Sequence, residues 1–294
     1  MLEYVSGIIT FSLIYVIATV GLAVFTGFTG LFSLGHAAFF AIGAYTAGIL
    51  TYFYDVNFWA ALTAGIAVSS LVGVIIGYPT LRAKLRSDYF AIATLGFGEA
   101  VRVLLENLDI TQGARGLPGI ASETTLPIVI VLTILVLWVA RNFVHSRYGR
   151  AAIAVREDFV AAEMMGINLF QVRMRSLVFS AGCAGLAGGL FAHYVSFIQP
   201  GMFTAALSTQ LTASVVAGGM GSITGPSVAA VLFVAVPEAL RMASMWRLVA
   251  YGFLLVAIMV FRPQGLFGFR EISWQSCVRC FRRKPAAAGG GAGE

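Results

Sequence analysis

The sequence predicts an all-α, polytopic transmembrane helical bundle with about eight to ten spans. The chain is 59% hydrophobic and only 11% charged, with a mean hydropathy of +0.88, whereas soluble domains carry about 25% charged residues. Apolar runs long enough for a spanning helix, which needs about 20 residues, recur along the chain. The short alternating segments of about 10 residues that are typical of a transmembrane β-barrel are absent from the sequence.

Taken in order, the apolar runs predict nine spans, at about 4–25, 29–53, 58–79, 89–108, 124–143, 173–195, 205–220, 224–241 and 246–262. The first run follows no basic region, so we expect no cleavable signal peptide. Nine crossings from an outside N-terminus place three basic clusters on one side, which the positive-inside rule assigns to the cytoplasm together with the C-terminus. These clusters are Arg82, Lys84 and Arg86; Arg141, Arg147, Arg150, Arg156, Arg173 and Arg175; and Arg262, Arg270, Arg279, Arg282, Arg283 and Lys284.

Two glycine-rich stretches interrupt the apolar pattern, Gly27–Gly35 after the first span and Gly218–Pro226 in the second half. Non-helical backbone at membrane depth is tolerated only where protein or a wet cavity surrounds it. Paired glycine-interrupted segments therefore point to a transport path. The alternative is that each stretch is an ordinary tight turn between short helices.

Small residues recur at helical spacing elsewhere, as in Ala181, Gly185 and Gly189, and in Gly43 and Ala47. Such faces let helix backbones approach closely in lipid. We expect close packing within this chain rather than a dimer seam.

The span at 89–108 carries Glu99, Arg102 and Glu106 on one helical face. Charges at membrane depth indicate a functional site by default. The alternative is that the helix ends early and leaves these charges at the outer surface. His36, which has no acidic or cysteine neighbour in sequence, is expected to be a hydrogen-bonded packing histidine.

The polar segment 146–170 lies between two long apolar runs, so it must lie outside the bilayer. Asp158 can cap a helix running to about Met165, and Gly166 is the residue type that ends one. About seven residues give roughly 10 Å of helix, too short to span. Its small and Met side chains suit insertion into a groove on a partner, whereas the alternative is a solvated connector.

Several motifs are missing from the sequence. Neither lysine, Lys84 or Lys284, lies in a phosphate-binding G-x-x-x-x-G-K-[ST] loop, and no H-E-x-x-H or G-x-S-x-G occurs. We therefore expect no enzyme activity and no cofactor bound by this chain. The lone pair Cys277 and Cys280 is too little for a zinc site, so no metal is expected either.

Five stretches, in order, resemble the ABC-importer permeases for branched-chain amino acids, the LivH/LivM group, and the LivM-type subunit in particular. They are Gly30–Tyr45, Tyr89–Phe97, Ser146–Asn168, Gly218–Ser222 with Gly225–Pro226, and Arg262–Gly268. The resemblance implies an inner-membrane permease paired with a LivH-like permease, two cytoplasmic ATPase subunits that hold ATP and Mg, and a periplasmic solute-binding protein.

The resemblance also assigns roles to residues. It implies that the segment 146–170, hereafter the coupling segment, meets the ATPases through Arg156, Glu157, Asp158, Ala161, Ala162, Glu163, Gly166 and Asn168. Candidates for the translocation path are Ser33, His36, Tyr89, Thr94, Glu99, Arg102, Gly218, Gly219 and Gly221. Residues 1–268 form the permease domain, and the basic tail 269–294 is expected to be disordered and close to lipid headgroups.

Leucine, isoleucine and valine are the expected substrates. Other amino acids, urea or short amides are alternatives within the same importer class. A different alternative is an ion-coupled secondary transporter or channel that uses Glu99 and Arg102. The basic charge follows the inter-span stretches, so the expected partners are proteins and membrane lipids and not nucleic acid.

Overall fold

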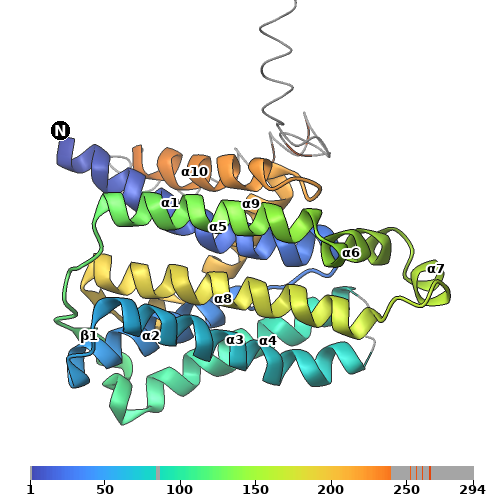
Figure 1. The fold of residues 1–294 in the computed structure, drawn as a ribbon. Coiled ribbons are helices and arrows are strands. Elements are labelled where there is room, and N and C mark those ends of the chain that lie inside the picture. Colours follow the sequence, from blue (N-terminus) through green and yellow to red (C-terminus); the bar gives the residue numbers. More distant parts are fainter. Residues whose placement is uncertain are drawn as a thin grey trace, which may run out of the picture.

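The computed structural model describes residues 2–83 and 87–239, together with residues 252, 256, 260 and 265. Long helices lie side by side along one direction and form a bundle (Figure 1). Two short helices, α6 and α7, protrude from one end of it, and the N-terminus lies at the opposite end (Figure 1).

The helices in chain order are α1 (Leu2–Leu22), the π-helical turn η1 (Ala23–Gly27), α2 (His36–Tyr54), α3 (Phe58–Arg82), α4 (Ser87–Asn107), α5 (Leu126–His145), α6 (Arg147–Glu157), α7 (Phe159–Met164), α8 (Leu169–Val195), α9 (Ala205–Gly218) and α10 (Thr224–Ala239). Short 3-10 turns lie at Asp109–Thr111, Gly113–Arg115 and Pro200–Met202. Strands β1 (Leu117–Pro118) and β2 (Phe197–Ile198) pair antiparallel, with Leu117 opposite Ile198.

Within the described residues, five helical stretches are long and apolar enough to cross a membrane: Tyr4–Gly27, His36–Tyr54, Phe58–Arg82, Leu126–His145 and Leu169–Val195. Helix α4 has the length but carries more charge, and α9 and α10 have only 14 and 16 residues. The prediction of one helix over 29–53 is wrong at its start, because α2 begins only at His36. The predicted span 246–262, apart from residues 252, 256 and 260, and the tail 269–294 lie outside the described residues.

Helix α8 is the centre of the bundle, with 89% of its apolar window buried, compared with 28% for α5. Its small residues allow this position. A Cβ atom on Gly188 would lie 1.9 Å from the Phe40 carbonyl oxygen, and one on Gly43 would lie 2.2 Å from the Gly185 carbonyl oxygen. The small-residue faces therefore serve close packing between α2 and α8 of the same chain, as predicted.

Charge divides the bundle into two ends. Helices α3 and α5 finish, and α8 starts, at the end that carries α6 and α7. The described arginines gathered there are Arg82, Arg141, Arg147, Arg150, Arg156, Arg173 and Arg175. We call this the basic end. The β1–β2 pair lies at the opposite end, where α4 finishes and α8 ends.

Candidate functional site: a broken span and the coupling segment

The first glycine-rich interruption is a non-helical stretch between the turn η1 and helix α2, and we call residues 30–35 the broken segment. It starts at Gly30, whose φ of +73° favours glycine, and ends where α2 begins. Its backbone cannot use the ladder of a helix, and in lipid each such group needs a partner within the protein. The structure supplies hydroxyl partners for this backbone from two other helices, α4 and α9.

Helix α4 provides two of the hydroxyls. The Phe32 amide donates to Ser87 Oγ at 3.1 Å, and the Leu34 amide donates to Thr94 Oγ1, also at 3.1 Å. Helix α9 provides the next two. Thr212 Oγ1 donates to the Ser33 carbonyl at 3.1 Å, and Ser208 Oγ accepts from the Ala37 amide at 2.9 Å. Hydrogen bonds to α4 and α9 therefore hold the broken segment on two sides.

His36 completes this polar cluster at the start of α2. It is fully buried, with Nδ1 2.9 Å from Ser33 Oγ and Nε2 2.6 Å from Ser180 Oγ of α8. Both ring nitrogens are thus engaged, as expected for a hydrogen-bonded packing histidine. Three of the path candidates, Ser33, His36 and Thr94, come together at the broken segment.

Tyr89 does not join this cluster. Its side chain is 64% exposed, whereas its neighbour Phe90 is buried, with its ring 5.6 Å from that of Phe25. On a helix, adjacent residues point in different directions, so Tyr89 faces away from the broken segment. Phe90 instead packs in one apolar cluster with Leu31 of the broken segment.

The second glycine-rich interruption is a tight turn between α9 and α10, which is the alternative considered for both stretches. Gly218 and Gly219 are buried in it and Gly221 is partly buried. Gly219 has φ +110°, and a Cβ on Gly265 would lie 2.5 Å from the Gly219 Cα. The two interruptions meet, because a Cβ on Gly27 would lie 2.4 Å from the Met220 carbonyl oxygen.

The charged side chains of α4 form ion pairs with one another. The alternative expected this helix to end early, but α4 continues to Asn107. Its other half, that the charges lie at the outer surface, stays a prediction. Arg102 Nε lies 2.8 Å from Glu99 Oε2, and its Nη1 bonds to Glu106 Oε1. All three side chains are partly exposed, and these contacts connect them to one another rather than to the broken segment.

The coupling segment contains the helix that the sequence predicts. Asp158 Oδ1 accepts from the amides of Val160 and Ala161 at 2.8 and 3.0 Å, and so caps the start of α7. Gly166 ends α7 with φ +81°. The Gly166 amide donates to the Glu163 carbonyl and the Ile167 amide to the Ala162 carbonyl, which is the bond pattern of a Schellman terminator.

Helix α7 leaves large apolar side chains uncovered in this chain. Met164 is 85% exposed, and Met165, Phe159 and Val160 are also exposed. Ala162 is different, since it is only 4% exposed and packs against its own chain. Of the predicted coupling residues, Ala161, Glu163, Gly166 and Asn168 are exposed and Ala162 is not.

Arg156, in the last turn of α6, links the coupling segment to the turn η1, just before the broken segment. Its Nη1 donates to the Gly27 carbonyl at 2.9 Å, and its Nη2 lies 2.6 Å from Glu157 Oε1. Gly27 ends the π-helical turn, where backbone carbonyls lack helical partners and a cation is favourable. The family resemblance implies that Arg156 meets the ATPases, and no local pattern in the sequence signals this partner 129 positions away.

Among the residues that the structure describes, no three His, Cys, Asp or Glu side chains come together in a way that could hold a metal ion. The chemistry of the described site is therefore that of hydroxyls, one buried imidazole and backbone groups. Such groups can exchange hydrogen bonds during a conformational change.

Residues 4–262 match the family model described as branched-chain amino acid transport system / permease component. The chain is 36% identical to the high-affinity branched-chain amino acid transport system permease protein LivM of Salmonella typhimurium, over 88% of this chain and 69% of that protein. It is 27% identical to the permease protein BraD of Pseudomonas aeruginosa, over 88% and 92% of the two chains. The autoinducer 2 import system permease protein LsrC of Salmonella typhi is 23% identical over 69% and 60%. No solved structure is significantly similar.

Proposed function

Because the chain belongs to the permease family of branched-chain amino acid transport systems, we propose that it is the LivM-type subunit of an ATP-driven importer for leucine, isoleucine and valine. The LivM protein of Salmonella typhimurium and the BraD protein of Pseudomonas aeruginosa both carry this substrate class in their names. The relative LsrC, at 23% identity, is named as a permease of an autoinducer 2 import system, so the substrate class needs a direct test. Other amino acids, urea and short amides are the competing substrates in an uptake assay.

The proposed importer holds this chain beside a homologous LivH-like permease in the bacterial inner membrane. Two cytoplasmic ATPase subunits bind ATP and Mg, a periplasmic protein delivers the solute, and this chain binds no nucleotide itself. The charge asymmetry supports the orientation, because the basic end lies in the cytoplasm by the positive-inside rule. The C-terminal tail, which follows the last predicted span, lies on the same side.

The observation that carries the proposal is the exposed apolar face of α7 at the tip of the basic end (Figure 1). Met164 and Met165 are the most exposed large apolar side chains described in this chain. Flexible Met side chains suit a groove on another protein. We place this face, with Phe159 and Val160, in a groove of an ATPase subunit.

Movement of the ATPase would then reach the membrane through Arg156. Asp158 joins α6 to α7 without an intervening loop, because it ends one helix and caps the next. A displacement of α7 therefore moves α6 and the guanidinium that holds the Gly27 carbonyl. The broken segment beyond Gly27 is held by side-chain hydroxyls rather than by the ladder of a helix, so it can exchange these partners for others when it rearranges.

The docking surface is tested by changing Met164 and Met165 together to alanine in the assembled transporter. We expect the ATPase subunits to be lost on purification of the permease, because buried interface anchors carry most of the binding energy. Uptake of labelled leucine should fall as well, because the transporter then lacks its ATPases.

The matched control is Ile110→Ala, which removes an exposed apolar side chain at the opposite end of the bundle. It should leave ATPase co-purification unchanged. Retention of the ATPases by the double variant, at the level of the control, would show that α7 is not the docking surface.

A further inference from the structure

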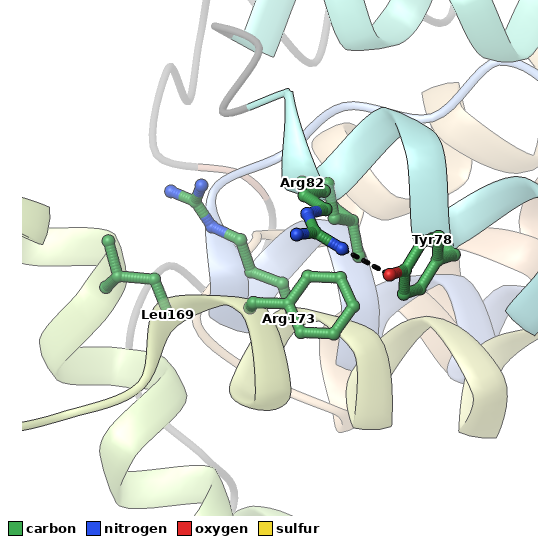
Figure 2. Close-up of a pocket in the computed structure, with 6 residues that line it drawn as sticks. Tyr78, Arg82, Leu169 and Arg173 are labelled. Carbon is green, nitrogen blue, oxygen red and sulfur yellow. Dashed lines mark hydrogen bonds between the residues drawn. The ribbon is translucent and has the colours of Figure 1, made fainter.

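A pocket of about 360 Å³ lies at the basic end, between the last turns of α3 and the first turns of α8. Its lining residues are Tyr78, Leu81, Arg82, Leu169, Phe170 and Arg173. Two arginines reach it from facing helices, Arg82 from α3 and Arg173 from α8 (Figure 2). The pocket is distinct from the broken segment and from the exposed face of α7.

The two guanidinium groups lack an acidic partner within the described part of the chain. Arg82 Nη1 donates to the neutral Tyr78 hydroxyl, and its Cζ lies 5.5 Å from the centre of that ring. Arg173 Nε is buried without a hydrogen-bond partner among the described residues. A buried donor left unpaired is unfavourable, and two positive charges beside one cavity favour an anion within it.

The shape and position of the pocket select the kind of anion. Guanidinium forks match the oxygens of phosphate. Leu81, Leu169 and Phe170 give the pocket an apolar side, and the face of α3 that leads from Tyr78 into the membrane continues through the exposed residues Ile75 and Leu71. A free ion would not use this apolar strip, whereas the acyl chains of a lipid would.

We propose that this pocket binds the phosphate of an anionic phospholipid, with Arg82 and Arg173 on the headgroup and the acyl chains along α3. Basic pockets between transmembrane helices suit such headgroups. The ligand would bridge α3 to the first turns of α8, directly after Asn168, whose Oδ1 accepts from the Gln171 amide at the start of α8. An influence on transport would rest on the proposed function, but the binding itself does not.

The test is native mass spectrometry of the purified full chain with phosphatidylglycerol, phosphatidylcholine or inorganic phosphate. We expect phosphatidylglycerol to be retained and phosphatidylcholine to be lost. In the double variant Arg82→Gln and Arg173→Gln, retention should fall at least tenfold, because two charge-assisted hydrogen-bonding groups are removed. The milder Tyr78→Phe, which removes only the hydroxyl that orients Arg82, should lower retention less, and it keeps the test valid if the double variant does not fold.

The matched control removes the same charge at the same end outside the pocket. Arg150 donates to the His145 carbonyl, and Arg175 lies over the Tyr148 ring at 4.2 Å, so the double variant Arg150→Gln and Arg175→Gln should retain phosphatidylglycerol. Equal losses in both double variants would show only a general effect of surface charge and would overturn the site. Equal retention of both lipids, or displacement of the lipid by millimolar phosphate, would overturn the choice of an anionic lipid.

Discussion

The broken segment and the coupling segment both interrupt the long helices of the bundle, but they complete their backbone hydrogen bonds in different ways. The broken segment uses hydroxyls that are far away in sequence, such as Thr94 and Thr212. The coupling segment uses local caps, above all Asp158, and leaves Met164 and Met165 in the open. The broken segment finds its hydrogen-bond partners within this chain, whereas the coupling segment leaves apolar side chains that a partner protein could cover.

This difference indicates where each kind of substitution acts. In the broken segment, a change removes a partner from several helices at once and weakens the whole bundle. In the coupling segment, a change acts on a short local helix and leaves the bundle intact. Substitutions in the two regions can therefore test the comparison directly.

The largest expected effect is that of His36→Leu. The substitution keeps the volume but leaves the hydroxyls of Ser33 and Ser180 without the ring nitrogens that they contact. We expect the free energy of unfolding to fall by about 2–6 kcal/mol, since each of the two buried hydroxyls left unpaired costs about 1–3 kcal/mol. Thermal unfolding in detergent measures it. His145→Gln, at an exposed site at the end of α5, is the control, and equal unfolding temperatures for the two variants would contradict the account.

A smaller fall in the free energy of unfolding is expected for Gly35→Ala. A Cβ on Gly35 would lie 2.3 Å from the Thr94 carbonyl oxygen, so α4 must move away from the broken segment. Overpacking of this kind costs about 1–3 kcal/mol. The yield of monodisperse protein and its unfolding temperature report the effect.

Gly96→Ala on α4 is the matched control, because its Cβ would meet no atom within 4 Å. It should be neutral or slightly stabilising, as expected for alanine in a helix. If Gly35→Ala were tolerated as well as Gly96→Ala, the broken segment would not be held against α4 as described.

The smallest effect is expected in the coupling segment, for Asp158→Ala. Loss of this cap costs about 1 kcal/mol and should act on α7 alone. The amides of Val160 and Ala161 donate to Asp158 Oδ1, so their hydrogen exchange should become about fivefold faster. The unfolding temperature of the bundle should stay unchanged. Asp158→Asn retains a capping oxygen and should restore slow exchange. A drop in bundle stability as large as that of His36→Leu would remove the distinction between the two regions.

The sequence predicts the coupling helix well because its signals are local. Asp158 and Gly166 act on neighbouring amides and carbonyls, and the helix they delimit is confirmed to within one residue at its end. The burial of Ala162 was not predictable in this way, because it depends on how α7 lies against the rest of the chain.

The broken segment is predictable only in outline. The glycine-rich composition indicates an interruption at Gly27–Gly35, but the second glycine-rich stretch, Gly218–Pro226, is a tight turn. Ser87, Thr94 and Ser208 look like ordinary hydroxyl residues, which commonly bond to the preceding turn of their own helix. Their distant partners follow from tertiary packing, as does the contact between Arg156 and Gly27.

The central claim is that the coupling segment acts on the broken segment through the contact between Arg156 and Gly27. It is tested most directly by Arg156→Gln in the assembled transporter, with leucine uptake and ATP hydrolysis measured on the same preparation. Arg150→Gln is the control, since Arg150 lies on the same helix but donates to the nearby His145 carbonyl. We predict at least a tenfold loss of uptake for Arg156→Gln, with the ATPase subunits still bound and ATP still hydrolysed. Uptake equal to that of Arg150→Gln would contradict the claim.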